Sequence, residues 1–426
     1  MSLPNSTTTA LAQASEPCRA VLERCLDGEE LGVNDAVTLL SAFASDLDAL
    51  GAVANHLRSE QAGDVASYVI NRNINFTNVC IKSCKFCAFS RVHRSEEGYF
   101  LPKVEILRRV SEAVDYGATE VCLQAGLAPS MDSGFYLRLI EGIRDLHPEL
   151  HIHALSPEEL KHGAQLTGQS IREFLVDLKS AGLGTIPGTS AEILDDAVRA
   201  RLSGGRITTQ EWIDVVSAAH ELGIRSSATI MFGHLEAPSH VAAHLASLRT
   251  LQRRTGGFTE FVPLSFVSSE APLYLKQLVP GVRAGPSTDE LLAVYAVSRL
   301  MLGREFVNLQ ASWVKLGLPM ATRLLQWGAN DLGGTLMNES ISTAAGADHG
   351  QFLRPTQLRS AIAAAGRTPI QRDTVYRELR RFSSDELGPS DRLDGVTSAS
   401  HFGSLEALTR GKQFRYELGR EPQLRR

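Results

Sequence analysis

From residue 73 onward, short runs of β-branched and aromatic residues alternate with longer stretches in which apolar residues follow a helical period. Each expected strand is followed by expected helix, and eight such units span about 260 residues, the length and rhythm of a (β/α)8 barrel. A doubly wound open sheet is the alternative, but no G-x-G-x-x-G run follows the first strand. The strands are expected at 73–79, 119–124, 150–155, 184–186, 226–231, 258–266, 306–311 and 329–332.

The segments on either side of this alternation have different patterns. Residues 1–15 are rich in Ser, Thr and Ala and are expected to be disordered, whereas 16–70 have a helical period throughout and predict a helical layer before the barrel. We place the barrel at 71–346 and a helical segment, with helices at 355–365 and 373–382, at 347–383. In 384–426, Gly, Ser, Asp and Pro interleave and a basic end follows, which predicts a solvated tail.

Composition narrows the class of protein. The chain is 43% hydrophobic and 21% charged, as globular proteins are, and its net charge of -5 gives no indication of nucleic-acid binding. No apolar run approaches the roughly 18 residues that a membrane span needs. The N-terminus lacks the basic start and apolar core of a signal peptide. We therefore expect a cytoplasmic protein, where thiols stay reduced.

Three of the six cysteines lie within eight residues, on the loop that leaves the first expected strand. Cys80, Cys84 and Cys87 are spaced C-x3-C-x2-C, whereas Cys18, Cys25 and Cys122 are scattered and are interpreted as apolar fillers. Since a barrel carries its chemistry at the carboxyl ends of its strands, the clustered cysteines are at the right end for a functional site.

The cysteine spacing favours an iron–sulfur cluster over zinc. A structural zinc site takes four ligands, usually as two spaced pairs, but this chain has no second C-x-x-C pair and the nearest further ligand is His93. A [4Fe–4S] cluster usually takes four thiolates, so three thiolates leave one iron open to bind a substrate. A partial zinc site and three unrelated cysteines are the alternatives.

Polar residues follow the other expected strands around the ring. His151 and His153 face the same side of a strand, where they could ligate metal or only make hydrogen bonds, and Trp313 with Lys315 could form a stacking platform or a packed rim. Asn330 and Asp331 precede a Gly-Gly pair that serves a ligand or a plain turn equally well. The candidates from these positions are Gln124, His153, Thr229, Glu236, Gln310, Asn330 and Asp331.

The cysteine motif, with Phe86 before its last cysteine, resembles the cluster loop of radical S-adenosylmethionine (SAM) enzymes. The resemblance implies a [4Fe–4S] cluster held by the three cysteines and SAM chelated to the open iron through its amino and carboxylate groups. We expect SAM contacts from Phe86 and Gln124, although Ala125 departs from the Gly-rich or acidic motif that such enzymes carry after the second strand. We also expect one from Glu236, because it follows a strand end, where it could instead only begin the next helix. The remaining candidates would contact substrate: His153, Thr229, Gln310, Asn330 and Asp331.

Four longer runs, at 73–80, 187–194, 255–264 and 328–335, resemble the tyrosine-using subunit of the deazaflavin (FO) synthase. This resemblance implies that a 5′-deoxyadenosyl radical takes hydrogen from L-tyrosine, whose 4-hydroxybenzyl group is transferred to 5-amino-6-(D-ribitylamino)uracil. It also implies a ferredoxin or flavodoxin as electron donor. Because the chain holds one cluster loop, the companion synthase subunit is expected to be separate.

Two menaquinone-pathway relatives, aminofutalosine synthase and dehypoxanthine futalosine cyclase, share several of these runs and are the alternative enzymes. A non-catalytic barrel stabilised by metal is the alternative outside catalysis. About four irons per chain would indicate the enzyme and one zinc the scaffold.

We predict that Cys80, Cys84 and Cys87 alone hold the cluster. Replacing any one of them by Ala should abolish both the iron–sulfur absorption of anaerobically purified protein and its activity. The matched replacements Cys18→Ala, Cys25→Ala and Cys122→Ala should leave both unchanged. Loss of the cluster from the Cys122→Ala variant would contradict a three-ligand site.

Overall fold

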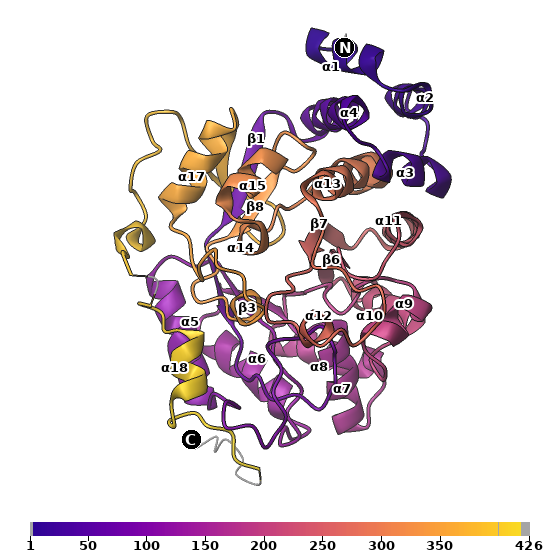
Figure 1. Ribbon diagram of the computed structural model, residues 1–426. Coiled ribbons are helices and arrows are strands. Elements are labelled where there is room, and N and C mark those ends of the chain that lie inside the picture. Colours follow the sequence, from indigo (N-terminus) through magenta and orange to yellow (C-terminus); the bar gives the residue numbers. More distant parts are fainter. Residues whose placement is uncertain (1–2, 399, 419–426) are drawn as a thin grey trace.

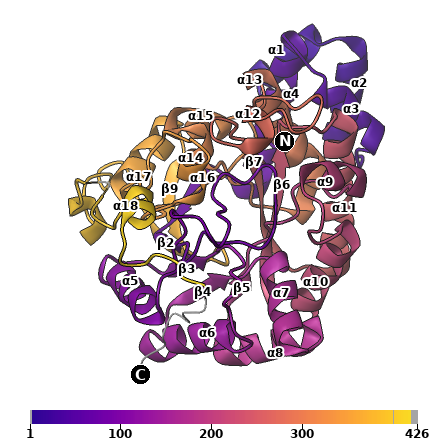
Figure 2. The ribbon, with the colours of Figure 1, turned by 60° about the horizontal axis from the view of Figure 1, so that its bottom comes forward.

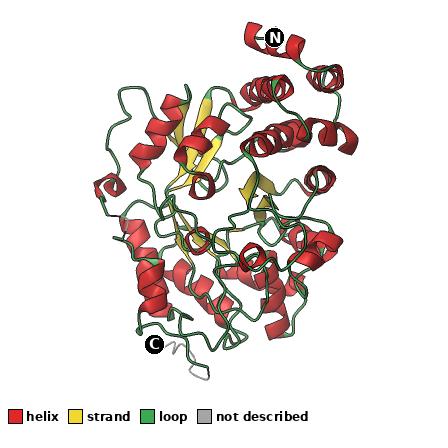
Figure 3. Ribbon diagram, in the orientation of Figure 1, coloured by secondary structure: helices red, strands yellow, loops and turns green. Residues whose placement is uncertain are grey.

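A sheet of six parallel strands curves through the centre of the molecule (Figures 1 and 3). The computed structural model describes residues 3–398 and 400–418. Each strand pairs in parallel with the next along the chain, as the alternation of strands and helices predicts. The strands, in order, are β2 (Asn71–Ile74), β3 (Glu120–Leu123), β4 (His151–Ala154), β5 (Thr185–Ile186), β6 (Arg225–Phe232) and β7 (Phe258–Ser265).

Two further pairings close this sheet into a ring. Residues 309–310 bridge in parallel to β7 at Phe261 and to β8 (Asp331–Gly334) at Asp331. Strand β8 in turn pairs with β1 (Val65–Val69), which leads into β2 across Ile70. The predicted barrel class is confirmed, and likewise the eight positions around it, but the strand expected at 306–311 is reduced to two bridging residues.

Helices surround the ring, and local signals fix where several of them begin (Figure 2). Before each of three helices, a Ser or Thr hydroxyl accepts from an N–H one turn on, and a Glu side chain returns the contact. Helix α9 begins at Asp196, and the Asp195 carboxylate before it accepts from Val198 N–H at 2.9 Å. The outer helices are α5 (Lys103–Asp115), α6 (Phe135–Leu146), α7 (Pro157–Thr167), α8 (Ile171–Ala181), α9 (Asp196–Leu202), α10 (Thr209–Glu221), α11 (Pro238–Thr255), α13 (Thr288–Leu302) and α15 (Leu318–Leu324).

Four short helical turns interrupt the loops between these elements: α12 (Pro272–Leu275), η1 (Gly303–Glu305), α14 (Trp313–Leu316) and α16 (Ile341–Ala344). No helix in residues 3–398 or 400–418 is long and apolar enough to cross a membrane.

Four helices precede the ring: α1 (Asn5–Gln13), α2 (Glu16–Leu26), α3 (Val33–Leu40) and α4 (Ser45–Ala62). Helix α3 packs on α11 and α4 packs on α13, in agreement with the predicted helical layer. The expectation of disorder up to residue 15 is wrong, because α1 buries Leu11 while it packs on α4. The helical expectation is also wrong for 65–69, which pair as β1.

The segment after the ring forms α17 (Pro355–Ala364), as expected, and then a hairpin of β9 (Thr368–Arg372) and β10 (Glu378–Arg381). The helix expected at 373–382 is therefore wrong. The Asp373 carboxylate accepts from the N–H groups of Val375 and Arg377, which makes a turn, and β9 pairs in parallel with β1. These pairings between distant residues override the local helical pattern.

The expected tail also packs on the barrel, in η2 (Arg392–Gly395), α18 (Leu405–Arg410) and the residues around them. The buried Arg359 guanidinium pairs with Asp391 and with Asp394. Phe402 is buried, and Phe100 N–H donates to Phe414 O at 2.8 Å. These anchors are too far apart in the sequence to show a period. Residues 419–426 of the expected tail lie outside the described residues.

The contact of α4 with residue Trp327 gives a prediction for stability. A Cβ added at Gly51 would lie 2.7 Å from the Trp327 ring, so Gly51→Ala should lower the free energy of unfolding by about 1–3 kcal/mol. Gly142, within α6, is the matched control: its added Cβ would lie 2.5 Å from the flexible end of the Lys103 side chain, which can move, and at an ordinary contact distance of 3.6 Å from Leu107. Gly142→Ala should raise the free energy of unfolding by up to about 1 kcal/mol, through helix propensity. If chemical denaturation gave the same change in the free energy of unfolding for Gly51→Ala and Gly142→Ala, the close packing of Gly51 on Trp327 would be contradicted.

Candidate active site

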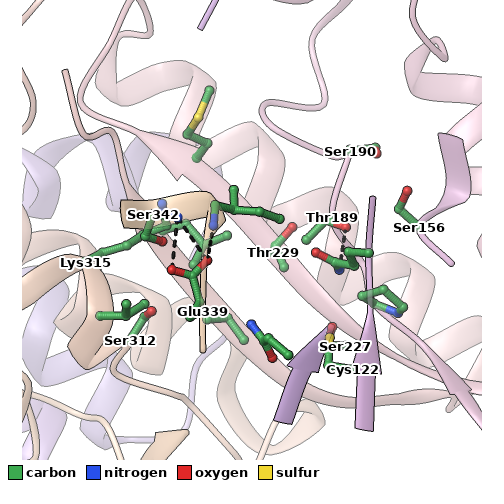
Figure 4. A pocket seen from close by; sticks show the side chains of 18 of the residues that line it. Cys122, Ser156, Thr189, Ser190, Ser227, Thr229, Ser312, Lys315, Glu339 and Ser342 are labelled. Atoms are coloured by element: carbon green, nitrogen blue, oxygen red, sulfur yellow. Dashed lines mark hydrogen bonds between the residues drawn. The ribbon is translucent and has the colours of Figure 1, made fainter. Parts of the chain in front are cut away.

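The carboxyl ends of the strands open into one cavity of about 410 Å³, a usual size for a small-molecule site. The structure brings together eight of the eleven residues selected from the sequence. These eight line the cavity: Cys80, Cys84, Phe86, Cys87, Gln124, His153, Thr229 and Gln310. Figure 4 shows the polar side chains that face it from several strands and loops.

Backbone hydrogen bonds fix the cysteine loop at the mouth of this cavity. Cys80 N–H donates to Arg91 O at 3.0 Å, and Ile81 N–H donates to Leu127 O at 2.9 Å. Lys85 N–H donates to Leu202 O at 3.1 Å. The loop is therefore held at three points by segments distant in the sequence, which limits how far the cysteines can move apart.

The three thiols fit a shared cluster. All three are free of disulfides and partly accessible, and burial raises the pKa of Cys84 to about 12, with Cys87 and Cys80 contributing. The neighbouring thiols thus disfavour the thiolate at Cys84, and a bound cationic cluster would relieve this repulsion. Cys122 also lines the cavity, so it is not simply an apolar filler, but its electrostatic neighbours are carboxylates rather than the other thiols.

Within the part of the chain that the structure describes, no three His, Cys, Asp or Glu side chains are grouped as the ligands of a single metal ion. In a cubane cluster each thiolate binds a different iron atom, so its ligands stand farther apart than those of one ion.

A buried ionic network joins the cysteine loop to the opposite wall. The Arg206 guanidinium lies 2.8 Å from Glu192 and 3.4 Å from Glu158, and it lies over the Phe86 ring at 5.6 Å. The Lys82 ammonium, within the cysteine loop, lies 3.0 Å from the same Glu158. Phe86 is thereby held by a cation–π contact, and sequence reasoning missed Arg206, which lies in an ordinary loop.

Gln124 and its neighbours form the wall after β3. The Gln124 amide donates to Thr189 Oγ1 at 3.1 Å, and Ala125 N–H donates to the Glu159 carboxylate at 3.1 Å. Burial raises the pKa of Glu159 to about 7. A Cβ at Gly126 would lie 2.3 Å from Val79 O, so only glycine lets this wall approach the cysteine loop so closely.

The floor of the cavity holds His153 among charged groups. His153 Nδ1 lies 2.7 Å from Thr185 Oγ1, and burial lowers its pKa to about 4, so the ring is neutral near pH 7. Arg372, from β9, also lines the floor and pairs with Glu260 at 3.7 Å. Sequence reasoning missed Arg372, because β9 lies in a segment expected to be helical.

Three predicted residues do not reach the cavity: Glu236, Asn330 and Asp331. The Glu236 carboxylate is buried, accepts from the N–H groups of its own loop and pairs with Arg283 at 2.5 Å. Asn330 Oδ1 accepts from Arg299 at 2.9 Å. Asp331 pairs with Arg372 at 2.6 Å. These three stabilise the barrel, so the expectation that they bind SAM or substrate is not supported by their positions.

Lys315 and Glu339 line the cavity beside Ser312 and Ser342 (Figure 4). Burial lowers the pKa of Lys315 and raises that of Glu339. Trp313 is part of a packed rim, since its Nε1–H donates to Gly334 O at 2.8 Å. Glu339 lies several residues beyond the end of β8 at Gly334. Sequence reasoning missed it because only residues at the strand ends were chosen as candidates.

Comparison with known protein families shows which family the chain belongs to. Residues 74–248 match the radical SAM superfamily, and residues 255–384 match the CofH/MqnC C-terminal region. The 5-amino-6-(D-ribitylamino)uracil–L-tyrosine 4-hydroxyphenyl transferase of Archaeoglobus fulgidus is 46% identical over 327 residues, which cover 77% of this chain and 92% of that protein. The chain belongs to this family of radical SAM enzymes. The Methanothermobacter thermautotrophicus transferase is 44% identical over 85% of this chain and 97% of its own length.

The FO synthase of Mycobacterium tuberculosis is 46% identical over 352 residues, 83% of this chain, and the chain spans only 40% of the length of that relative. Among solved structures, methylornithine synthase matches with a TM-score of 0.65 at 19% identity, covering 82% of this chain and 97% of its own. The FeFe-hydrogenase maturase HydG of Carboxydothermus hydrogenoformans matches with a TM-score of 0.67 at 16% identity, covering 87% and 83%. These structures confirm the barrel fold.

The network around Arg206 gives a prediction for the stability of the radical SAM site. Arg206→Met would leave the partly buried Glu192 carboxylate without a cation and the buried Glu158 carboxylate with Lys82 alone, and should lower the free energy of unfolding by about 3 kcal/mol. It should also lower the iron retained per chain after gel filtration, because the cysteine loop loses its contact with the opposite wall.

The control is Arg172→Met. Arg172 pairs with Glu221 at 2.9 Å on the exposed surface, and its loss should cost about 1 kcal/mol or less. Equal losses of stability in the two variants, measured by denaturant unfolding, would show that the Arg206 network is not a buried clamp.

Proposed function

We propose that this chain transfers the 4-hydroxybenzyl group of L-tyrosine to 5-amino-6-(D-ribitylamino)uracil, as a step in deazaflavin coenzyme biosynthesis. The observation that carries the proposal is the similarity to the Archaeoglobus transferase, which extends over nearly the whole of that protein and includes both matched family regions. The cavity supports it, since three free thiols and a set of polar and charged groups face one space of about 410 Å³.

In this proposal Cys80, Cys84 and Cys87 hold a [4Fe–4S] cluster, as the family implies. The cluster with SAM, when bound, supplies a 5′-deoxyadenosyl radical that takes hydrogen from tyrosine. The chain holds the reactants in line and excludes water, which is what a protein contributes to cofactor chemistry. The cysteine loop and the wall around Gln124 bound the cofactor side of the cavity, and Phe86 packs against the same side.

The floor suits the ribityl chain and the uracil. Neutral His153, Gln310 and Thr229 offer uncharged hydrogen-bonding groups to hydroxyls and ring amides. Thr229 Oγ1 donates to Gly188 O at 2.8 Å, which leaves its oxygen free to accept a further hydrogen bond. Arg372 and Glu260 on the same floor are paired with each other, so the uncharged groups are the ones left to a ligand, and they match a polyol better than a polycarboxylate.

Two partners complete the proposal. A one-electron donor such as ferredoxin or flavodoxin would reduce the cluster, and a separate deazaflavin synthase subunit would take the product. The setting would be the cytoplasm, in which reduced thiols persist.

The proposal predicts the product of a defined assay. Anaerobically reconstituted, reduced protein given SAM, tyrosine and the ribityl-diaminouracil should form 5′-deoxyadenosine and a uracil adduct heavier by a hydroxybenzyl group. Ring-labelled tyrosine should carry its label into that adduct, as mass spectrometry would show. The Cys84→Ala variant is the control that should form neither product.

The contrary result is also specific. Formation of 5′-deoxyadenosine only with a futalosine-type substrate, and never with tyrosine, would replace this function by that of the menaquinone-pathway relatives.

A further inference from the structure

The cavity contains one cation that the protein leaves without a partner. Four side chains of Lys or Arg line it, and three of them are paired: Lys82 with Glu158, Arg206 with Glu192, and Arg372 with Asp331. The Lys315 ammonium has no hydrogen bond and no ion pair among the described residues, although the backbone N–H of Lys315 donates to Ser312 O at 3.1 Å. A charge withdrawn from bulk water is costly unless it is compensated, so an anionic group of a ligand is the expected partner.

Glu339 is a carboxylate in the cavity lining that, like Lys315, has no partner of opposite charge among the described residues. Its carboxylate accepts from Ile341 N–H at 2.9 Å and from Ser342 N–H at 2.9 and 3.0 Å, and no cationic side chain pairs with it within the described chain. Of the other buried carboxylates in the lining, Glu158 pairs with Lys82 and Glu260 with Arg372, whereas Glu120 accepts from Asn71 Nδ2 at 2.8 Å. Lys315 and Glu339 influence each other electrostatically without forming an ion pair.

The backbone that presents Glu339 is strained. Leu336, Met337 and Asn338, the three residues before it, all have positive φ, at 65°, 23° and 80°. Side chains other than glycine rarely adopt this region, and such strain gathers at ligand sites where surrounding contacts enforce it. Here Asn338 and Glu339 N–H both donate to Gln351 O at 3.0 Å, and Asn338 Nδ2 donates to Phe402 O at 2.9 Å.

We propose that Lys315 and Glu339 form the subsite for the amino-acid head group of tyrosine, with Lys315 binding the α-carboxylate and Glu339 the α-ammonium. Opposite charges that face one cavity without meeting each other are complementary to a zwitterion. Figure 4 shows both residues on one side of the cavity with Ser312 and Ser342, away from Thr189, Ser190 and Ser156. The inference rests on the proposed function, since it takes tyrosine as the amino acid.

Both residues line the same cavity as the three cysteines. A head group held by Lys315 and Glu339 would therefore share that space with the cysteine loop. The Cα–Cβ bond of the amino acid would then lie between this subsite and the rest of the cavity. Such fixed placement of the reacting bond is what a radical cleavage requires from the protein.

The test uses two analogues of tyrosine that each lack one charge: tyramine has no carboxylate, and 3-(4-hydroxyphenyl)propanoate has no ammonium. The anaerobically reconstituted full chain is compared with Lys315→Met, Lys315→Arg and Glu339→Gln. Lys161→Met is the matched control, since Lys161 pairs with Glu211 at 2.6 Å and does not line the cavity. The measurements are the KM for tyrosine, the inhibition constants of both analogues and the dissociation constant of SAM.

We expect Lys315→Met to raise the KM for tyrosine and the inhibition constant of the propanoate by about 10- to 100-fold, the loss of one charge-assisted hydrogen bond. Its inhibition constant for tyramine and its affinity for SAM should not change, and Lys315→Arg should restore part of the loss. Glu339→Gln should weaken tyrosine and tyramine but not the propanoate. Lys161→Met should match the parent chain throughout.

Several results would overturn the subsite. An equal loss for tyramine in the Lys315→Met variant would show that this residue does not bind the carboxylate, and a loss of SAM affinity alone would assign it to the cofactor. No change in any constant would also contradict the inference. Because each comparison is made between ligands on one variant, a general loss of folded protein cannot imitate the expected pattern.

The two proposals fail separately. If the parent chain forms no hydroxybenzyl adduct, the proposed function is wrong. If the adduct forms but the variants do not distinguish the analogues, only the subsite is wrong.

Discussion

The double pairing of one extended segment, residues 65–74, is the constraint on which the structure depends. Along one edge it pairs with β8, and along the other with β9 at its beginning and with β3 at its end. This segment closes the ring, so that all the parallel strands end at one rim. The cysteine loop leaves the end of β2, and Glu339 follows β8 next to it. Groups about 250 residues apart in the chain thereby face one cavity because the sheet closes, a geometry typical of barrel sites.

Charge compensation then separates the residues that support the barrel from those available to ligands. Asp331, Glu236 and Arg206 are satisfied by other side chains, and their contacts fix β8, the loop after β6 and the cysteine loop. Burying such charges in pairs stabilises the fold only while both partners remain. The side chains left over are those that the cavity presents: neutral His153, the free thiols and the unpaired Lys315. In a polar barrel interior, side chains without a partner within the protein are therefore the first candidates for ligand contacts.

Sequence patterns predicted local features well and non-local ones poorly. The starts of helices α7 and α8 are fixed by local signals, since the Ser156–Glu159 and Ser170–Glu173 contacts lie within one turn. Strand β9 was missed because its stability comes from pairing with β1, about 300 residues away in the chain. In the site, the cysteines were identifiable from their spacing alone. Glu236 and Glu339 both follow strands, so the sequence does not distinguish them. The folded structure shows that the Glu236 carboxylate is paired with Arg283 and hydrogen-bonded by N–H groups of its own loop.

The central claim is that the three cysteines at the mouth of this cavity hold a cluster with one iron open to SAM. Mössbauer spectroscopy of chain reconstituted with ⁵⁷Fe, without and with SAM, tests it most directly, because each iron reports its own ligands. A cluster held by three thiolates has one iron that differs from the other three. The account predicts that SAM shifts the signal of that one iron and leaves the other three unchanged. Four equivalent irons that do not respond to SAM would contradict it.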